Sequence, residues 1–242
     1  MAPAGIGDSV EGVHAVAAAI AAGRVRRLHV ERGRRDALDD LIETARAAGA
    51  DVAVVGDVRP IATTTTPQGV VAECRPLRTL DLDEAVAVAT PAALVLLDHL
   101  EDPRNVGAVA RSALAAGMGA LVVARRRSAP LSASTFKAAA GALEYLPICE
   151  VSSIAAAVDD LRRADVWTVG LDAGGDSSLF GLGLLTEPVG IVVGAEGAGL
   201  SRLVRDRVDV VASIPLAPEV ESLNASVAAA LAVFEVRRQR SA

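Results

Sequence analysis

The second part of the chain alternates short apolar runs with longer stretches of helical pattern. From residue 92 onward, six runs rich in Val, Leu, Ile and Ala are bounded by turn residues: 93–97, 120–123, 146–149, 166–171, 189–193 and 210–214. Apolar runs of this length, separated by helical patterns, are typical of a parallel sheet covered by helices on both faces. A last segment, 223–240, is rich in Ala and Val and is predicted as a long helix. We therefore expect an α/β fold with a parallel sheet in residues 92–242.

Residues 1–75 are predicted as a smaller α/β unit. The expected elements are a helix, a strand, a helix and two strands, at 12–22, 25–30, 35–48, 51–55 and 70–73. A polar stretch at 61–69, with four consecutive threonines, separates the last two strands. Residues 76–91 are acidic and end in Pro91, which favours a linker. A chain of 242 residues can hold two such domains, each with its own core.

Composition excludes several classes of protein. No uninterrupted apolar run approaches the roughly 20 residues of a membrane span, and the first nine residues lack the pattern of a signal peptide, so we expect a cytoplasmic protein. Cys74 and Cys149 lie in apolar surroundings without His or Cys at metal-ligand spacing. They are expected to be buried free thiols, with neither a metal nor a disulfide.

The formal net charge of −6 argues against indiscriminate binding to nucleic acid. Basic residues are nevertheless clustered. Six arginines fall between Arg24 and Arg35 against one acid, and three more are consecutive at 125–127. Such patches can hold phosphates on an acidic protein, although either cluster could equally be the solvated face of a helix or loop.

Three loops follow predicted strands at their carboxyl ends, where open α/β sheets bind ligands. The first contains Asn105, Gly107 and Arg111. Asn105 can cap the helix that follows, and a helix N-terminus with a guanidinium suits a phosphate or a developing oxyanion. Taken alone, this loop could also be a capped helix with a surface arginine.

The other two loops are rich in glycine and in neutral polar groups, respectively. Residues 194–199 hold three glycines around Glu196, which implies a backbone that turns sharply or approaches a ligand closely. Residues 213–226 hold two prolines, then Ser222, Asn224 and Ser226 at the start of the last helix. Helix capping alone would also explain these polar residues.

Together the three loops resemble the three motifs of the SpoU-type (TrmH-family) 2′-O-ribose RNA methyltransferases of the SPOUT superfamily. The matching stretches are Asn105-x-Gly107-x-x-x-Arg111-x-Ala113, Val193-Gly-Ala-Glu-Gly-x-Gly, and Ile214-Pro215 with Ser222-Leu-Asn224-x-Ser226-x-Ala228. The resemblance implies a trefoil-knotted C-terminal domain that binds S-adenosyl-L-methionine through Gly194, Ile214 and Leu223, and a homodimer. It also implies a catalytic set formed by Arg111, Asn105, Glu196, Ser222 and Asn224.

Further stretches are similar to the branch that methylates a guanosine of 23S ribosomal RNA. These are Arg127-Ser-Ala-Pro-Leu, Ala140-Gly-Ala-Leu-Glu144 and, in residues 1–75, Gly12-Val-His14-Ala-Val and Gln68-Gly69-Val-Val-Ala. The first domain is thereby similar to the branch's RNA-binding domain of ribosomal-protein type. Pro67 stands where that branch has His, and Leu216 and Pro218 stand where it has Met and Gly.

Methyl transfer to an alcohol requires alignment of the two groups and stabilisation of charge on the 2′-oxygen. A guanidinium is a poor base, so Arg111 is expected to lower the cost of forming the alkoxide, while the other four polar residues hold the loops and the ribose in register. Three alternatives remain: a transfer-RNA 2′-O-methyltransferase, a non-catalytic RNA-binding or ribosome-assembly protein on the same scaffold, and a nicotinamide oxidoreductase. The last should show G-x-G-x-x-G after its first strand, and this chain does not.

Overall fold

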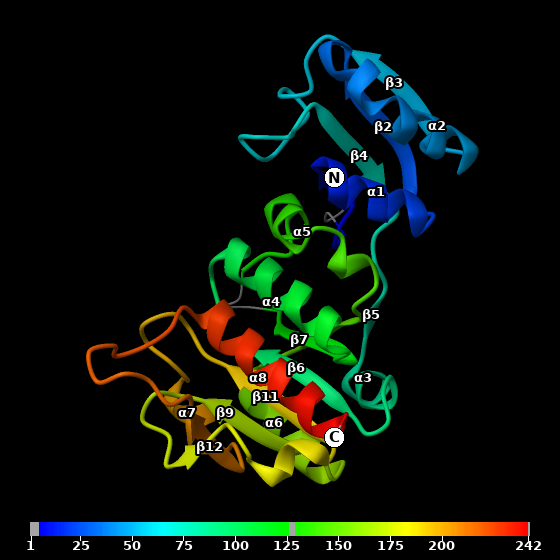
Figure 1. Ribbon diagram of the computed structural model, residues 1–242. Coiled ribbons are helices and arrows are strands. Elements are labelled where there is room, and N and C mark those ends of the chain that lie inside the picture. Colours follow the sequence, from blue (N-terminus) through cyan, green and yellow to red (C-terminus); the bar gives the residue numbers. More distant parts are fainter. Residues whose placement is uncertain (1–4, 126–128, 242) are drawn as a thin grey trace. The chain divides into compact units, whose positions relative to one another are not determined.

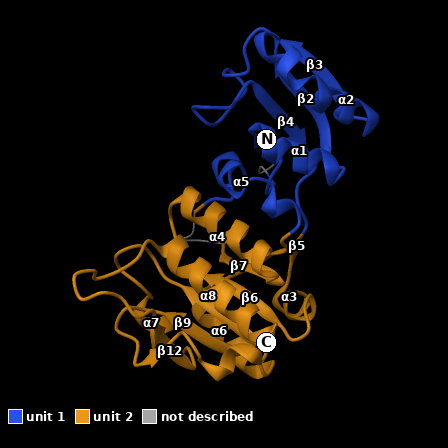
Figure 2. Cartoon of the chain, in the orientation of Figure 1, with its two compact units in different colours: residues 1–78, 130–145 blue, residues 79–129, 146–242 orange. Residues whose placement is uncertain are grey.

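The computed structural model describes residues 5–125 and 129–241, which form two compact units (Figure 2). The first unit takes the chain up to residue 78 together with residues 130–145. The second takes residues 79–129 and 146–242. Arg126 and Arg127 of the basic run at 125–127 lie outside the described residues.

The second unit is built on a sheet of eight strands in the order β10-β12-β9-β11-β6-β7-β8-β5, and all its pairs are parallel. Strands β6, β7, β9, β11 and β12 of this sheet are labelled in Figure 1. Its strands are β5 (Thr79–Leu80), β6 (Ala93–Leu97), β7 (Ala120–Ala124), β8 (Ile148–Val151), β9 (Trp167–Leu171), β10 (Ser177–Ser178), β11 (Val189–Val193) and β12 (Val210–Ser213). Its helices are α3 (Leu82–Ala87), α4 (Pro103–Ala116), α6 (Ile154–Arg163), α7 (Arg202–Arg205) and α8 (Ala225–Arg240), with a 3₁₀ turn at Gly183–Thr186. The expected parallel α/β sheet is confirmed.

The central strands are buried on both faces. Every residue of β6 and β11 is buried, and alternate residues of β6, such as Leu94 and Leu96, join one apolar cluster with α6. Helices α3 and α6 pack against strands of this sheet, and α4 and α8 pack against each other and against β7 and β11, respectively. No helix in the described parts of the chain is long and apolar enough to cross a membrane.

The first unit holds a mixed four-stranded sheet in the order β1-β4-β2-β3. Its strands are β1 (Ser9–Glu11), β2 (Val25–Glu31), β3 (Asp51–Val55) and β4 (Val70–Cys74), and its helices are α1 (Val13–Ala21), α2 (Asp39–Ala47) and α5 (Ala133–Ala139). Strands β2 and β3 are parallel, whereas β4 is antiparallel to both β1 and β2. Helix α5 and the 3₁₀ turn Ala142–Glu144 pack against α1, and α5 also packs against β1.

Several element boundaries differ from those expected. The helix predicted at 35–48 begins only at Asp39, after 3₁₀ turns at Arg32–Arg34 and Asp36–Leu38. The strand predicted at 146–149 is β8, which starts after Pro147 because proline has no N–H for the ladder. Residues 76–91, expected to be a linker, include β5 and α3, and the acidic Asp81 and Glu84 form the capping box of α3.

Candidate active site

Three side chains from three different loops form a closed hydrogen-bonded triangle, which we call the polar triangle: Asn105, Glu196 and Asn224. Asn105 Nδ2 donates to Glu196 Oε2 at 3.0 Å, and Asn224 Nδ2 donates to Glu196 Oε1 and to Asn105 Oδ1, each at 3.1 Å. The three residues belong to the first turn of α4, the loop after β11 and the N-cap of α8. The structure thus joins all three loops at the carboxyl edge of the parallel sheet.

The amide of Asn224 is oriented by its own helix. Its Oδ1 accepts from the backbone N–H of Ser226 at 2.9 Å and from Ser226 Oγ at 2.6 Å, which caps α8. With the oxygen occupied, Nδ2 is left to donate to the polar triangle. A capping asparagine therefore serves both the helix and the site.

The glycine-rich loop after β11 folds back on itself. Ala195 and Gly199 exchange two backbone hydrogen bonds of 2.9 Å across the loop. A Cβ on Gly194 would lie 2.5 Å from the backbone nitrogen of Leu200 and closer still to the carbonyl of Gly199. Gly197 and Gly199 have φ angles of 75° and 67°, in the left-handed region that favours glycine. The loop therefore exposes backbone where a side chain could not fit.

A cavity of about 240 Å³ opens beside this loop. Its wall is formed by the loop itself, by the ends of β9 and β12, by the loop after β12 and by the first turn of α8. Of the residues singled out from the sequence, the lining includes Gly194, Ile214, Leu223, Ser222 and Glu196. Most of the lining is apolar side chain or backbone, the kind of surface that small-molecule sites present.

Arg111 is on α4 but outside the polar triangle. It lies six positions after Asn105, which turns it to a different side of the helix. It is exposed, and within residues 5–125 and 129–241 no hydrogen bond or ion pair occupies its guanidinium. The group can therefore be offered to a ligand.

Two carboxylates that carry no role in the sequence analysis hold the glycine-rich loop. Asp98 follows β6, is buried, and accepts from the backbone N–H of Ser201 at 2.7 Å. Asp172 follows β9 and lines the cavity. Burial raises the pKa of Asp172, but hydrogen bonds from the Gly174 N–H and the Arg205 guanidinium outweigh burial and lower the pKa below its usual range. Asp98 and Asp172 each come directly after a predicted strand, and this position is the feature of the sequence that could have identified them as site residues.

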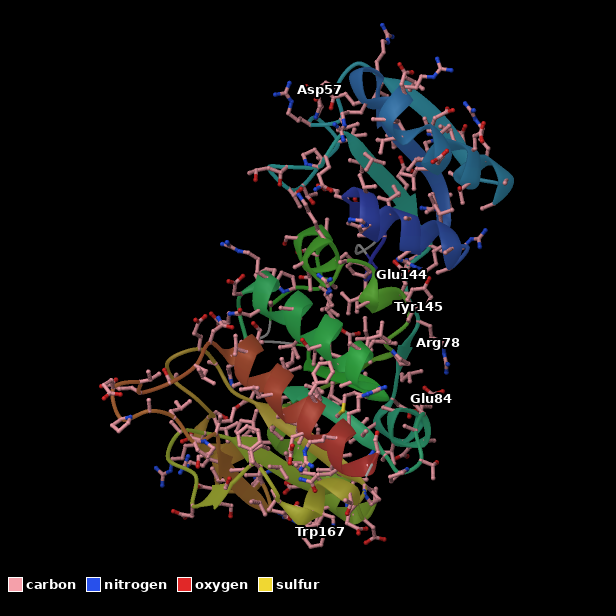
Figure 3. The ribbon with its side chains drawn as sticks, viewed as in Figure 1. Asp57, Arg78, Glu84, Glu144, Tyr145 and Trp167 are labelled. Carbon is pink, nitrogen blue, oxygen red and sulfur yellow. The ribbon has the colours of Figure 1, made fainter. Side chains whose placement is uncertain are left out.

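In the first unit, one arginine of the 24–35 cluster belongs to the interior. Arg24 is buried and makes two hydrogen bonds of 2.6 Å to Glu144 (labelled in Figure 3), and it donates to the Gly7 carbonyl at 3.0 Å. The reading of Arg24 as a surface phosphate contact is wrong, because its charge is already paired. Five arginines of the cluster are exposed, of which Arg27 pairs with Asp51: Arg26, Arg27, Arg32, Arg34 and Arg35.

The threonine run closes a loop over a buried carboxylate. Glu11 is fully buried in β1 and accepts from the backbone and hydroxyl groups of both Thr63 and Thr64. Lys137 Nζ from α5 donates to Thr66 Oγ1 at 2.6 Å and to the Thr66 carbonyl. Thr63 and Thr64 therefore stabilise the fold of the first unit by supplying hydrogen bonds to a buried carboxyl group.

Both cysteines are free and buried, as expected. Burial raises the pKa of the Cys74 thiol to about 12 and that of Cys149 to about 11, so neither is a reactive thiolate at neutral pH. Among residues 5–125 and 129–241, no group of three or more His, Cys, Asp or Glu side chains could hold a metal ion.

Comparison with known proteins gives the family. Residues 92–234 match the SpoU rRNA Methylase family, and residues 9–80 match the domain described as RNA 2′-O ribose methyltransferase substrate binding. The chain is 36% identical to the 23S rRNA (guanosine-2′-O-)-methyltransferase RlmB of Coxiella burnetii, over 97% of this chain and 96% of that protein. It is also 45% identical to an uncharacterized tRNA/rRNA methyltransferase of Mycobacterium avium, over 66% of this chain and 52% of that protein.

Solved structures agree with the sequence relatives. The SpoU methyltransferase AviRb of Streptomyces viridochromogenes, solved in complex with the cofactor AdoMet, superposes with a TM-score of 0.79 at 31% identity, covering 96% of this chain and 90% of that one. The resemblance seen in the three loop motifs is confirmed by a family match that spans all three. The chain belongs to the SpoU rRNA methylase family of RNA 2′-O-ribose methyltransferases.

Proposed function

We propose that this protein transfers the methyl group of S-adenosyl-L-methionine to the ribose 2′-hydroxyl of a guanosine in 23S ribosomal RNA. The observation that carries the proposal is the polar triangle, which ties together the three loops around the cavity and leaves Arg111 free on α4, the helix that also holds Asn105. A relative that matches over 96% of its own length and is named as a 23S rRNA guanosine methyltransferase supports the choice of substrate.

The cavity fits the cofactor in its chemistry. Apolar side chains such as Ile214 and Leu223 suit an adenosine, and the glycine-rich loop presents backbone because Gly194 leaves no room for a side chain. When bound, the cofactor supplies an electrophilic methyl group on a sulfonium. Gly194, Ile214 and Leu223 would hold it, and Glu196 and Ser222 would face it from the same wall.

Arg111 is proposed to stabilise charge on the 2′-oxygen as the hydroxyl proton passes to solvent water. A fixed cation near a developing alkoxide lowers the barrier, and the free guanidinium of Arg111 is available for this. Asn105, Glu196, Ser222 and Asn224 keep the loops and the ribose in register around it. Arg111→Ala should lower methyl transfer about 100- to 1,000-fold while leaving cofactor affinity unchanged.

The test uses the full chain with tritiated cofactor and two RNAs, 23S ribosomal RNA and transfer RNA. Arg163→Ala is the matched control, because Arg163 is also an exposed arginine but lies on α6 and pairs with Asp160. Methylation of a guanosine in 23S RNA by the control and not by Arg111→Ala is the expected result. Transfer to transfer RNA alone would overturn the substrate, and full activity of Arg111→Ala would overturn the mechanism.

The first unit is proposed to bind the RNA. Exposed arginines at 26, 32, 34 and 35 can contact phosphates and position the RNA without reading its bases. We assign RNA binding to residues 1–75, connection to 76–91 and methyl transfer to 92–242, with residues 130–145 assisting the first part because they pack with it.

We further propose that the protein is a homodimer and that its C-terminal part forms a trefoil knot, both as in the family it belongs to. An apolar stripe on α8 supports the dimer: Val227, Leu231 and Phe234, spaced four and three residues apart, are 47%, 38% and 47% exposed. Leu231→Glu should yield a monomer in sedimentation equilibrium, whereas Val88→Glu, an exposed valine outside the stripe, should not. A monomeric wild-type protein would overturn the dimer.

A further inference from the structure

The glycine-rich loop after β11 is contacted on two sides by carboxylates that follow the two neighbouring strands. In the sheet, β11 lies between β9 and β6. Asp98 after β6 binds the backbone of Ser201 at the end of the loop, and Asp172 after β9 lies against Gly199 on the other side. Two carboxylates at equivalent positions therefore hold one loop, but only Asp172 lines the cavity.

Asp172 has a defined place against the loop. A Cβ on Gly199 would lie 2.9 Å from Asp172 Oδ2, so the carboxylate packs where a side chain would otherwise be. Its Oδ1 accepts from the Gly174 N–H at 2.9 Å and pairs with Arg205 Nη1 at 2.7 Å. Arg205 Nη2 also donates to the Gly174 carbonyl at 3.0 Å, which fixes the pair to the turn after β9.

The ionisable side chains that line the cavity are all acidic. Asp172 and Glu196 are the acidic residues in its lining, and no Arg, Lys or His in the described part of the chain lines it. Glu196 is hydrogen-bonded by two neutral amides, whereas Asp172 is partly neutralised by Arg205, which lies outside the lining. A cation in this cavity would be favoured over a neutral group of the same shape.

We infer that Asp172 is a specificity-determining residue that makes the cavity prefer the cationic sulfonium of S-adenosyl-L-methionine over the neutral thioether of its product, S-adenosyl-L-homocysteine, and that Arg205 limits this preference. The inference rests on the proposed function and deepens it. A preference of this sign favours exchange of spent product for fresh cofactor.

The experiment measures the affinity of the full chain for both molecules by calorimetry. Asp172→Asn keeps the shape of the side chain and removes its charge. The ratio of the affinity for S-adenosyl-L-methionine to the affinity for S-adenosyl-L-homocysteine should therefore fall about 3- to 10-fold. Arg205→Gln removes the neutralising charge, so the same ratio should rise. Asp160→Asn, which removes an exposed carboxylate on α6, should leave the ratio unchanged.

The ratio separates charge selection from mere support of the loop. If Asp172 only stiffens the loop, Asp172→Asn weakens both molecules equally, and this result overturns the inference. An unchanged or lowered ratio in Arg205→Gln also overturns the inference. If Asp172→Asn does not fold, the result for Arg205→Gln alone tests whether charge selects the ligand. Failure of the wild-type chain to bind either molecule would instead overturn the proposed function.

Discussion

Gly194→Ala should disable the cofactor cavity by a steric effect alone. The backbone of Gly194 does not adopt a left-handed φ, so alanine costs nothing in conformation there. The added Cβ would lie 2.5 Å from Leu200 N and nearer to the Gly199 carbonyl. Both are backbone atoms that the Ala195–Gly199 hydrogen bonds hold in place, so the loop must move as a whole. Overpacking of this kind costs about 1–3 kcal/mol.

Alanine substitutions at two other glycines serve as comparisons for Gly194→Ala. At Gly197 a Cβ meets nothing within 4 Å but φ is 75°, so alanine there should cost about 1–2 kcal/mol through backbone strain. At Gly183 a Cβ also meets nothing within 4 Å and φ is not left-handed, so Gly183→Ala should change stability by less than about 0.5 kcal/mol.

Two measurements check the series. Trp167, which is labelled in Figure 3, is the only tryptophan of the chain. It begins β9 and is 47% exposed, so its fluorescence during urea unfolding reports on the second unit. Calorimetry reports S-adenosyl-L-methionine binding, which Gly194→Ala should weaken at least about tenfold, equivalent to about 1.4 kcal/mol. Wild-type affinity and an unchanged unfolding midpoint in Gly194→Ala would refute the steric reasoning.

Two further predictions concern α8. Asn224→Asp keeps the cap but places a second carboxylate against Glu196, so methyl transfer should fall about tenfold or more with helix content unchanged by circular dichroism. Wild-type activity in Asn224→Asp would contradict charge repulsion at this position. Hydrogen bonds from Arg238, and also from Gln239 and the Gly181 N–H, lower the pKa of buried Glu235 to about 2. Because the pKa of Glu235 is lower in the folded state, its ionised form stabilises the fold above about pH 4.5, and this stabilisation is lost as pH falls toward 2. The free energy of unfolding of the wild type should therefore exceed that of Glu235→Gln by on the order of 2 kcal/mol at neutral pH. Urea unfolding in acid should show that this difference vanishes.

The sequence was most informative where burial repeats over several residues. Strands β6 and β11 have their expected bounds because a strand buried on both faces must be apolar throughout. The convergence of the loops at one edge was also predictable, since parallel strands end on the same side. The two-residue strands β5 and β10 and the three-residue β1 were not, because such short runs carry no period.

Charged residues were harder to place because sequence shows charge but not partners. Arg24 and Arg26 are two residues apart in one cluster, yet only Arg24 is buried, and what distinguishes it is Glu144, 120 residues away. Asp172 looks like an ordinary polar residue after a strand until Gly199 and Arg205 are seen around it. Pairings over such distances are set by packing, and no local pattern contains them.

Residues 130–145 show how packing overrides position in the chain. They lie between β7 and β8 of the second unit, so their place in the sequence favours the methyltransferase domain. Their side chains belong to the first unit. Phe136 fills the space above Gly7, where a Cβ would lie 2.5 Å from the ring, and the buried carboxylate of Glu144 pairs with Arg24.

Removing residues 1–75 would therefore do more than delete an RNA-binding domain. It would remove Arg24, the cation that pairs with Glu144, and it would expose to water the apolar surface of Phe136, which is buried in the full chain. A fair separation of the two roles keeps the whole chain and neutralises exposed arginines such as Arg26 and Arg32, because these carry charge on the surface without supporting the core. One of the two compact units is assembled from two separate stretches of sequence (Figure 2), so a deletion that follows the order of the chain cuts through that unit.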